Sequence, residues 1–293
     1  MILIILIAVC LLWSLIEQKL LMTSKYFVSA SAKEKLPAPV SFVVLSDLHN
    51  HTFGKQNQKL IQRIDQLGPD FIIVAGDIIT KNKVSIPSNA YSIMEALAKR
   101  YPIYYAYGNH EQKFDQMKVL KRDDKAAIDS QNLYTTWIEY KQKLSDLGVK
   151  FLINQTVTLQ VKGKTLHITG AALDKRFYER GELVTMEADY MESLIGKRKD
   201  HNYQILIVHH PLYFKEYLDW GADLTIAGHL HGGLVRLPFL GGVLSPQARF
   251  FPKYDAGCFR QEGRQMIVSR GLGTHSYMPR LFNIPELVYI RLE

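Results

Sequence analysis

The sequence predicts an α/β protein built around parallel strands. Short apolar runs rich in β-branched residues alternate with segments whose apolar residues recur at helical spacing. The order strand, helix, strand, helix, strand is complete by residue 107, and this order favours parallel strands joined by helical crossovers. The chain has 293 residues, of which 47% are hydrophobic and 22% charged, so it can bury the core of one sizeable globular domain.

The first half of the chain supplies three strands and two helices before a polar interruption. The elements expected in order are a strand over residues 41–46, a helix around residues 60–67, a strand over 71–75, a helix over 91–100 and a strand over 103–107. Gly68-Pro69 ends the first helix. Residues 112–131 mix charges of both signs without apolar periodicity, so we expect a surface excursion there before a helix over residues 135–147.

The second half is richer in strands. Strands are expected over residues 149–153, 157–161, 166–169, 204–208, 223–227, 265–269 and 287–291, with a helix over residues 186–195. Neither an internal repeat nor a low-complexity tract interrupts this pattern. We therefore expect one domain over residues 40–293.

The N-terminus has a different character. Residues 1–16 carry no charged side chain and are almost wholly aliphatic. We expect an uncleaved N-terminal membrane anchor over residues 1–22, followed by a polar tether over residues 23–39, which places the protein at the cell membrane. A cleaved signal peptide is disfavoured because no basic residue precedes the apolar run, and a lipoprotein signal is disfavoured because Val9 precedes Cys10.

Charge and cysteine content limit the kinds of partner and site. The formal net charge of +8 is compatible with an anionic partner such as a phosphorylated substrate or an anionic membrane surface, although from charge alone a solvated basic surface without a partner is the better explanation. The two cysteines, Cys10 and Cys258, exclude a thiolate metal site and make a disulfide framework improbable.

Five short polar motifs each follow a predicted buried strand. They are Asp47-Leu48-His49, Gly76-Asp77, Gly108-Asn109-His110-Glu111, His209-His210-Pro211 and Gly228-His229-Leu230-His231. Ligands bind outside the carboxyl ends of the strands in open α/β sheets, so these loops can converge on one crevice. Singly, most of the motifs are better explained as turns with ordinary histidines.

Taken together, the motifs point to a metal site. Ionised carboxylates and several imidazoles are costly to gather in one place unless cations offset them. Nitrogen and oxygen ligands without thiolate suit divalent ions such as Mn, Fe, Co or Zn. The glycines in three of the motifs allow sharp turns and close approach of the backbone.

The order of these motifs resembles the calcineurin-like metallophosphoesterase superfamily, and the segments Ser46-Asp47-Leu48-His49-Asn50 and Gly271-Leu272-Gly273-Thr274 are similar to its bacterial membrane-associated branch. The resemblance implies a four-layer α/β/β/α sandwich with two central mixed sheets. It also implies two divalent metal ions. The implied ligands of the first are Asp47, His49, Asp77 and His231. Asp77 would bridge to a second metal completed by Asn109, His209 and His229.

The resemblance further implies a phosphoester hydrolase, of phosphodiesterase or pyrophosphatase type, in which His110 is the catalytic histidine. Gly76-Asp77 runs on as Ile78-Ile79-Thr80, without the second acidic residue found in some members, which argues against a protein serine/threonine phosphatase. We expect a small-molecule, lipid-linked or polymer phosphoester substrate and no stable nucleic-acid partner. A nuclease or cyclic-nucleotide phosphodiesterase would share the ligand set, and a non-catalytic binding scaffold is the rival from another class.

Other polar residues leave alternatives open. Glu111 either orients His110 or is an exposed loop carboxylate, and His51 is better explained as a solvated loop histidine than as a substrate contact. The family pattern favours His209 over His210 as the ligand. His275 and Arg280 lie in the loop before the last strand, and Arg280 either meets a phosphate oxygen or has no part in the site. Lysines after residue 16 favour a cytoplasmic domain, whereas the resemblance favours an extracytoplasmic one.

Overall fold

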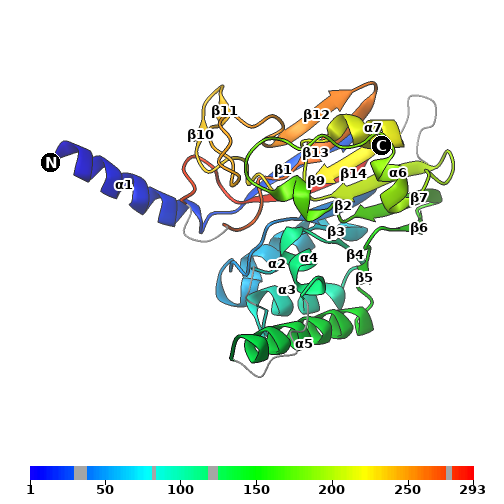
Figure 1. Ribbon diagram of the computed structural model, residues 1–293, viewed down its shortest axis with the longest axis horizontal. Helices are drawn as coiled ribbons and strands as arrows, with labels where there is room; N and C mark the ends of the chain where they lie inside the picture. Colours follow the sequence, from blue (N-terminus) through cyan, green and yellow to red (C-terminus); the bar gives the residue numbers. More distant parts are fainter. Residues whose placement is uncertain (30–37, 81–83, 118–124, 275–278) are drawn as a thin grey trace.

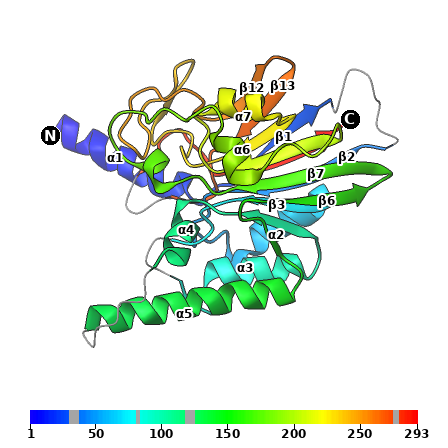
Figure 2. The same cartoon turned by 45° about the vertical axis from the view of Figure 1, so that its right-hand side comes forward.

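The computed structural model describes residues 1–29, 38–80, 84–117, 125–274 and 279–293. Two six-stranded sheets lie face to face, and helices cover the outer side of each (Figures 1 and 2). The helices on the first sheet are α2 (Gln58–Leu67), α3 (Asn89–Ala98), α4 (Asn109–Asp115) and α5 (Lys125–Asp146). Those on the second are α6 (Tyr190–Ile195) and α7 (Phe214–Trp220). The predicted pair of central mixed sheets is confirmed.

The first sheet has the strand order β1-β14-β2-β3-β4-β5. Its strands are β1 (Met22–Val28), β14 (Glu286–Leu292), β2 (Val40–Leu45), β3 (Phe71–Ala75), β4 (Ile103–Ala106) and β5 (Lys150–Phe151). Strands β2 to β5 run parallel, as their helical crossovers predict. Strand β14 pairs antiparallel with β2 and parallel with β1.

The second sheet has the order β12-β13-β9-β8-β7-β6. Its strands are β12 (Gly257–Gln261), β13 (Arg264–Val268), β9 (Leu224–Ala227), β8 (Tyr203–Val208), β7 (Lys164–Ala171) and β6 (Gln155–Val161). The four central strands are parallel, and each edge strand joins its neighbour as an antiparallel hairpin. A separate two-stranded ribbon pairs β10 (Arg236–Leu237) with β11 (Gly241–Gly242).

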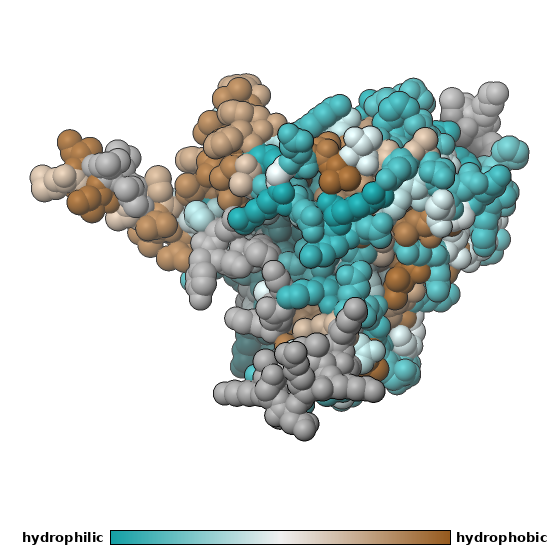
Figure 3. All heavy atoms as spheres, viewed as in Figure 1, coloured by the Kyte–Doolittle hydropathy of each residue, from teal (hydrophilic) through white to brown (hydrophobic). Residues whose placement is uncertain are grey.

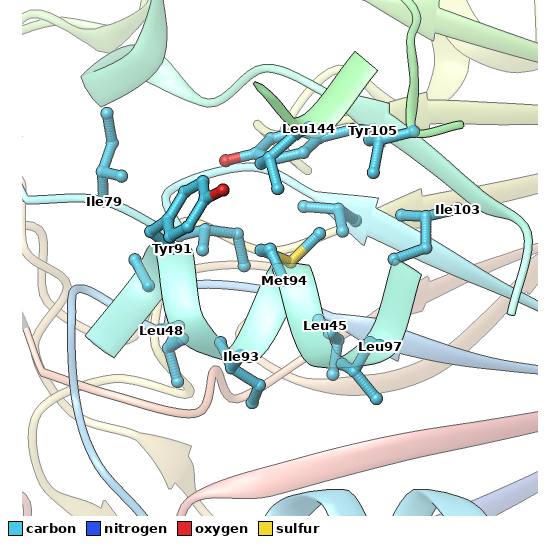
Figure 4. Close-up of a cluster of buried hydrophobic side chains, with 14 of the residues drawn as sticks. Leu45, Leu48, Ile79, Tyr91, Ile93, Met94, Leu97, Ile103, Tyr105 and Leu144 are labelled. Carbon is cyan, nitrogen blue, oxygen red and sulfur yellow. The ribbon is translucent and has the colours of Figure 1, made fainter. Parts of the chain in front are cut away.

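Strand alternation assigns the apolar side chains to the layers. In β2, Val43 and Leu45 face the helices of the first sheet, whereas Phe42 and Val44 face the second sheet. Figure 4 shows part of the cluster on the helical side, where Leu45 lies with Ile93 and Leu97 of α3. Because both faces of each central strand are buried, these strands are continuous apolar runs, which is why they were predictable.

Some elements differ from the expectation. Helix α5 begins at Lys125, well before the predicted start at residue 135, because residues 125–134 show little of the apolar periodicity on which the prediction relied. Of the expected surface excursion over residues 112–131, residues 112–115 belong to α4 and residues 125–131 to α5, while residues 118–124 lie outside the described part. The helix predicted over residues 186–195 spans Tyr190–Ile195.

The expected tether also contains regular structure. Met22–Val28 form strand β1, which extends the first sheet beside β14. Its side chains are mostly half-buried or exposed, as expected for an edge strand. Because such a strand needs few apolar residues, its composition is similar to that of a polar linker, and it was not predicted as a strand. Residues 30–37 of the expected tether lie outside the described part of the chain.

The prediction of a membrane anchor over residues 1–22 is wrong, and with it the predicted single-pass membrane location. The apolar N-terminal segment forms helix α1 (Ile2–Glu17), which has 16 residues. Such a helix is about 24 Å long, shorter than the roughly 30 Å hydrocarbon core of a bilayer. Within the described residues, no helix is both long and apolar enough to cross a membrane. Figures 1 and 3 show α1 projecting from the body with an apolar surface.

Candidate metal centre

Five parallel strands carry polar side chains to one rim of the two sheets. Strands β2, β3 and β4 belong to the first sheet, and β8 and β9 to the second. The side chains after their carboxyl ends are Asp47 and His49 (β2), Asp77 (β3), Asn109 and His110 (β4), His209 (β8), and His229 and His231 (β9). The aspartates and histidines among them fall into three overlapping groups whose ligand atoms lie within 4.8 Å of one another.

One group joins Asp47, His49 and His231. The Nε2 atoms of His49 and His231 are 3.2 Å apart, and His231 Nε2 lies 3.3 Å from Asp47 Oδ1. All three side chains are buried, and Asp47 has no exposed surface. A carboxylate oxygen and two imidazole nitrogens therefore converge from both sheets.

A second group joins Asp77, His209 and His229. His209 Nε2 lies 3.2 Å from Asp77 Oδ2, and His49 Nε2 lies 3.9 Å from the same oxygen. Burial alone would raise the pKa of Asp77, but the imidazoles of His110 and His209 lower it well below its ordinary value. Asp77 is thus ionised near neutral pH and lies between the two groups.

His110 belongs to the third group, with His49 and Asp77. Its Nε2 is 3.8 Å from Asp77 Oδ2, and its ring centroid is 4.8 Å from that of His49. Its backbone N–H donates to Asp77 Oδ1 at 2.9 Å. His110 therefore lies at the edge of the cluster formed by the other ligands.

Some buried polar atoms of the site have no hydrogen-bond partner within the described part of the chain. The two that matter most here are His229 Nε2 and Asn109 Oδ1. Buried polar atoms of this kind are costly unless something else satisfies them. Both are ligand atoms for divalent ions of borderline softness, so the residues fit the metal ions that the sequence predicts.

The hydrogen bonds behind the imidazoles determine which nitrogen faces the cluster. His209 Nδ1 lies 2.6 Å from the Ala75 carbonyl oxygen, and His231 Nδ1 lies 3.2 Å from the Gly273 carbonyl oxygen. Burial alone would lower the pKa of His209, but the carboxylates of Asp77 and Asp47 raise it to about 10. A carbonyl oxygen only accepts, so each Nδ1 carries a proton and each ring directs its Nε2 toward the cluster. This is the arrangement that holds metal-binding histidines in other proteins.

The backbone is unusual at these positions. Asp47, His49, Asp77, His229 and His231 all have positive φ angles, between 49° and 71°. Non-glycine residues seldom adopt this region, and they do so mostly at functional sites where the surrounding structure compensates the strain. Sequence motifs carry no direct sign of this strain.

Close backbone packing explains two of the motif glycines. A Cβ atom on Gly108 would lie 2.1 Å from Asp77 Oδ1, and one on Gly228 would lie 2.4 Å from Asp47 Oδ2. Any side chain at either position would displace an aspartate of the cluster. The glycines are therefore required by the aspartates beside them.

The profile of the calcineurin-like phosphoesterase family matches residues 40–233, more than half of the chain. The chain belongs to this family. Phosphoesterases of this family use a dinuclear site of divalent metals, and the clusters above provide candidate ligands for it. The expectations of an enzyme that hydrolyses phosphoesters and of a divalent-metal site are confirmed.

The similarity of this phosphoesterase to its relatives covers most of the chain. The metallophosphoesterase YkuE of Bacillus subtilis is 26% identical over 255 residues, covering 86% of this chain and 78% of YkuE. The phosphodiesterase YaeI of Escherichia coli is 25% identical over 261 residues, covering 87% of this chain and 83% of YaeI. The UDP-2,3-diacylglucosamine pyrophosphatase LpxG of Chlamydia trachomatis is 25% identical over 293 residues, covering 85% of this chain and 82% of LpxG.

Glu111 has a role in the phosphoesterase site that neither interpretation of the sequence anticipated. Its carboxylate is fully buried and accepts hydrogen bonds from the backbone N–H groups of Asp77 (2.8 Å), Ile78 (2.9 Å) and Gly108 (3.0 Å). The Tyr105 hydroxyl donates to it at 2.8 Å. Glu111 is therefore buried, and its carboxylate connects the loops that carry Asp77 and Asn109.

Arg280 is a structural residue. It is 1% exposed, and its guanidinium donates to the carbonyl oxygens of Asn283 (2.7 Å), Gly273 (2.8 Å) and Arg270 (2.8 Å). These bonds shape the loop that bears Gly273, whose carbonyl orients His231. The suggested contact of Arg280 with a phosphate oxygen is not what the structure shows.

Three further histidines differ in their surroundings. His51 is half-buried rather than fully solvated, and its Nε2 lies 2.8 Å from the Gln18 carbonyl oxygen at the end of α1. His210 is fully buried, and burial lowers its pKa to about 3, so it stays neutral next to His209. His275 lies outside the described residues.

Proposed function

We propose that this phosphoesterase hydrolyses phosphodiesters or pyrophosphates with two metal ions held by the clusters at the sheet rim. Asp47, His49 and His231 would hold the first ion and Asn109, His209 and His229 the second, with Asp77 shared. The observation that carries the proposal is the position of Asp77, whose Oδ2 lies within 3.9 Å of imidazole nitrogens from both clusters.

Two divalent ions would supply a hydroxide nucleophile and offset the charge that develops on the phosphoryl oxygens. The protein orients the site: the Nε2 atoms of His209 and His231 face inward, and the carboxylates of Asp47 and Asp77 attract cations. His110, at the edge of the cluster, would donate a proton to the leaving oxygen, which is work suited to an imidazole near neutral pH.

Two observations support a diester or pyrophosphate as substrate. Two of the relatives are named as a phosphodiesterase and a pyrophosphatase. Asp77 is followed by Ile78 and Ile79, which are completely buried. The chain therefore has apolar residues where some superfamily members carry a second acidic group. The net charge of +8 favours an anionic substrate of either kind.

The test is hydrolysis of bis-p-nitrophenyl phosphate by the full chain, supplied in turn with Mn²⁺, Zn²⁺, Co²⁺ and Fe²⁺. We expect turnover with at least one ion and its loss on adding a chelator. Asp77→Asn should lose metal and activity together, because this carboxylate is assigned to both ions. An Asp77→Asn protein that still binds two metals per chain would contradict the proposal that both ions share Asp77. Inactivity of the unmodified chain with every ion would contradict the proposed hydrolytic activity.

A further inference from the structure

A cavity of about 490 Å³ opens beside His110 and Asn109. One wall is helix α4 with the residues that follow it, including Gln116. The other is the 3₁₀ helix η2 (Lys175–Tyr178), which follows β7. The volume falls in the range of ligand pockets and is larger than a phosphate group alone requires.

The two walls are joined at their base. Gln112 of α4 is 8% exposed, and its Nε2 donates to the Leu173 carbonyl oxygen at 2.9 Å. Leu173 precedes η2, so this bond holds the helix and the loop at a set separation. The cavity is therefore built into the fold.

Tyr178 stands out among the side chains of this region. Its ring lines the cavity and lies 5.1 Å from the His229 ring and 6.2 Å from the His209 ring, centroid to centroid. Its hydroxyl is buried and has no hydrogen-bond partner in the part of the chain that the structure describes. The neighbouring Tyr213 and Tyr217 hydroxyls, by contrast, donate to backbone carbonyls at 2.9 and 2.7 Å.

We infer that the cavity is the subsite for the organic group of the phosphoester and that Tyr178 is a substrate-binding residue whose hydroxyl donates to a phosphoryl oxygen. A buried donor beside two metal-ligand imidazoles is costly without a partner, and a bound phosphoryl group would provide one. The ring of Tyr178 and the side chain of Met117 offer apolar surface beside polar Gln116. The subsite therefore suits a bulky, partly apolar organic group. This inference rests on the proposed function.

Tyr178→Phe in the full chain tests the hydroxyl. We expect kcat/KM for bis-p-nitrophenyl phosphate to fall by about tenfold to a hundredfold, as for loss of a hydrogen bond to a charged group. Inhibition by inorganic phosphate should weaken as well. Metal content and Tm should not fall, because the hydroxyl has no protein partner to lose. Unchanged turnover, or a loss of metal that accompanies the loss of turnover, would overturn the assignment.

The matched control for the hydroxyl is Tyr203→Phe. Tyr203 is 6% exposed and opens strand β8, at the opposite end of that strand from His209. The same chemical change there should leave kcat/KM and phosphate inhibition as in the unmodified chain.

Gln116→Trp tests the cavity without touching the core, since Gln116 is exposed. The larger side chain should occupy the subsite and raise KM for bis-p-nitrophenyl phosphate several-fold, while inorganic phosphate inhibits as before. Gln142→Trp, on the exposed face of α5, is the control and should change neither value. An unaltered KM would contradict the subsite. An equal loss of affinity for the ester and for inorganic phosphate would contradict it as well.

The activity of the unmodified chain distinguishes a failure of the proposed function from a failure of the proposed subsite. If it hydrolyses the ester with none of the metal ions, the proposed function itself fails. If it is active and the Tyr178 and Gln116 variants behave like it, the proposed activity is retained and only the assignment of the subsite is wrong.

Discussion

At the scale of single residues, the buried carboxylate of Glu111 shows how one acid can organise two ligand loops. It accepts hydrogen bonds from backbone N–H groups of two loops, one with Asp77 and one with Gly108. These loops follow the neighbouring strands β3 and β4. Each of these donors is buried and would otherwise lack an acceptor. The ligand positions of Asp77 and Asn109 are thereby coupled.

Glu111→Gln should therefore destabilise the fold and weaken metal binding. The amide replaces an acceptor oxygen by a donor, so at least one buried N–H group faces a donor instead of an acceptor. We expect a loss of about 2–4 kcal/mol in the free energy of unfolding, measured by denaturant titration. Metal affinity should fall by about 10–100-fold.

The exposed Glu179→Gln is the control for this change and should alter the free energy of unfolding by less than about 0.5 kcal/mol. A Glu111→Gln protein as stable as this control would show that the loops hold their positions without the carboxylate.

His110→Ala makes a different prediction, because His110 lies at the edge of the ligand cluster. We expect the variant to retain its metals and to lose about 10²–10⁴-fold in kcat, the usual contribution of a general acid. Steady-state kinetics and metal analysis of the same sample measure both. His201→Ala, in an exposed loop, should behave as the unmodified chain. Normal turnover by His110→Ala would remove its proposed role.

The site residues show which information the sequence carries. The motif residues were predictable, because each polar group follows an apolar strand and their order resembles a known superfamily. The roles of Glu111, Arg280 and Tyr178 were not, because they depend on contacts with other segments, such as Tyr178 with His229. The positive φ angles of Asp47 and Asp77 could not be predicted from the sequence either.

At the scale of elements, the buried strands were predictable and the exposed edges were not. Strands β2, β3 and β8 are continuous apolar runs, whereas β1 mixes Lys25 and Ser24 with Tyr26 and Phe27. An edge strand of this kind is specified by its pairing with β14 rather than by its own composition.

This difference leads to a prediction for shortened chains. A chain that begins at Gln18 keeps β1, whereas one that begins at Pro39 loses it and exposes the edge of β14. We expect the second to be less stable than the first by at least about 3 kcal/mol, from the lost ladder of hydrogen bonds and apolar contacts. Thermal and denaturant unfolding of both chains measure this. Equal stability would mean that β1 adds nothing to the sheet.

At the scale of the whole molecule, the proposed metals would connect the two sheets. Asp47 and Asp77 belong to the first sheet, and His209, His229 and His231 to the second. Removing the ions with a chelator should therefore lower the Tm of the whole domain in a single transition. At a free metal concentration of 1,000 times Kd each bound ion contributes about 4 kcal/mol.

Calorimetry with and without chelator measures this shift, and Asp77→Asn should show little further change on chelation. A Tm independent of chelator in a protein shown to contain metal would contradict a connection between the sheets.

The place of β14 has a consequence for how the protein is made. Residues 286–292 insert between β1 and β2, whose residues leave the ribosome long before those of β14. A nascent chain that has not yet produced β14 cannot complete the first sheet, and its β2 edge stays open to other chains. The first sheet can therefore be completed only after β14 has been synthesised, and a chain that stops before residue 286 should yield an aggregation-prone product rather than a partly active enzyme.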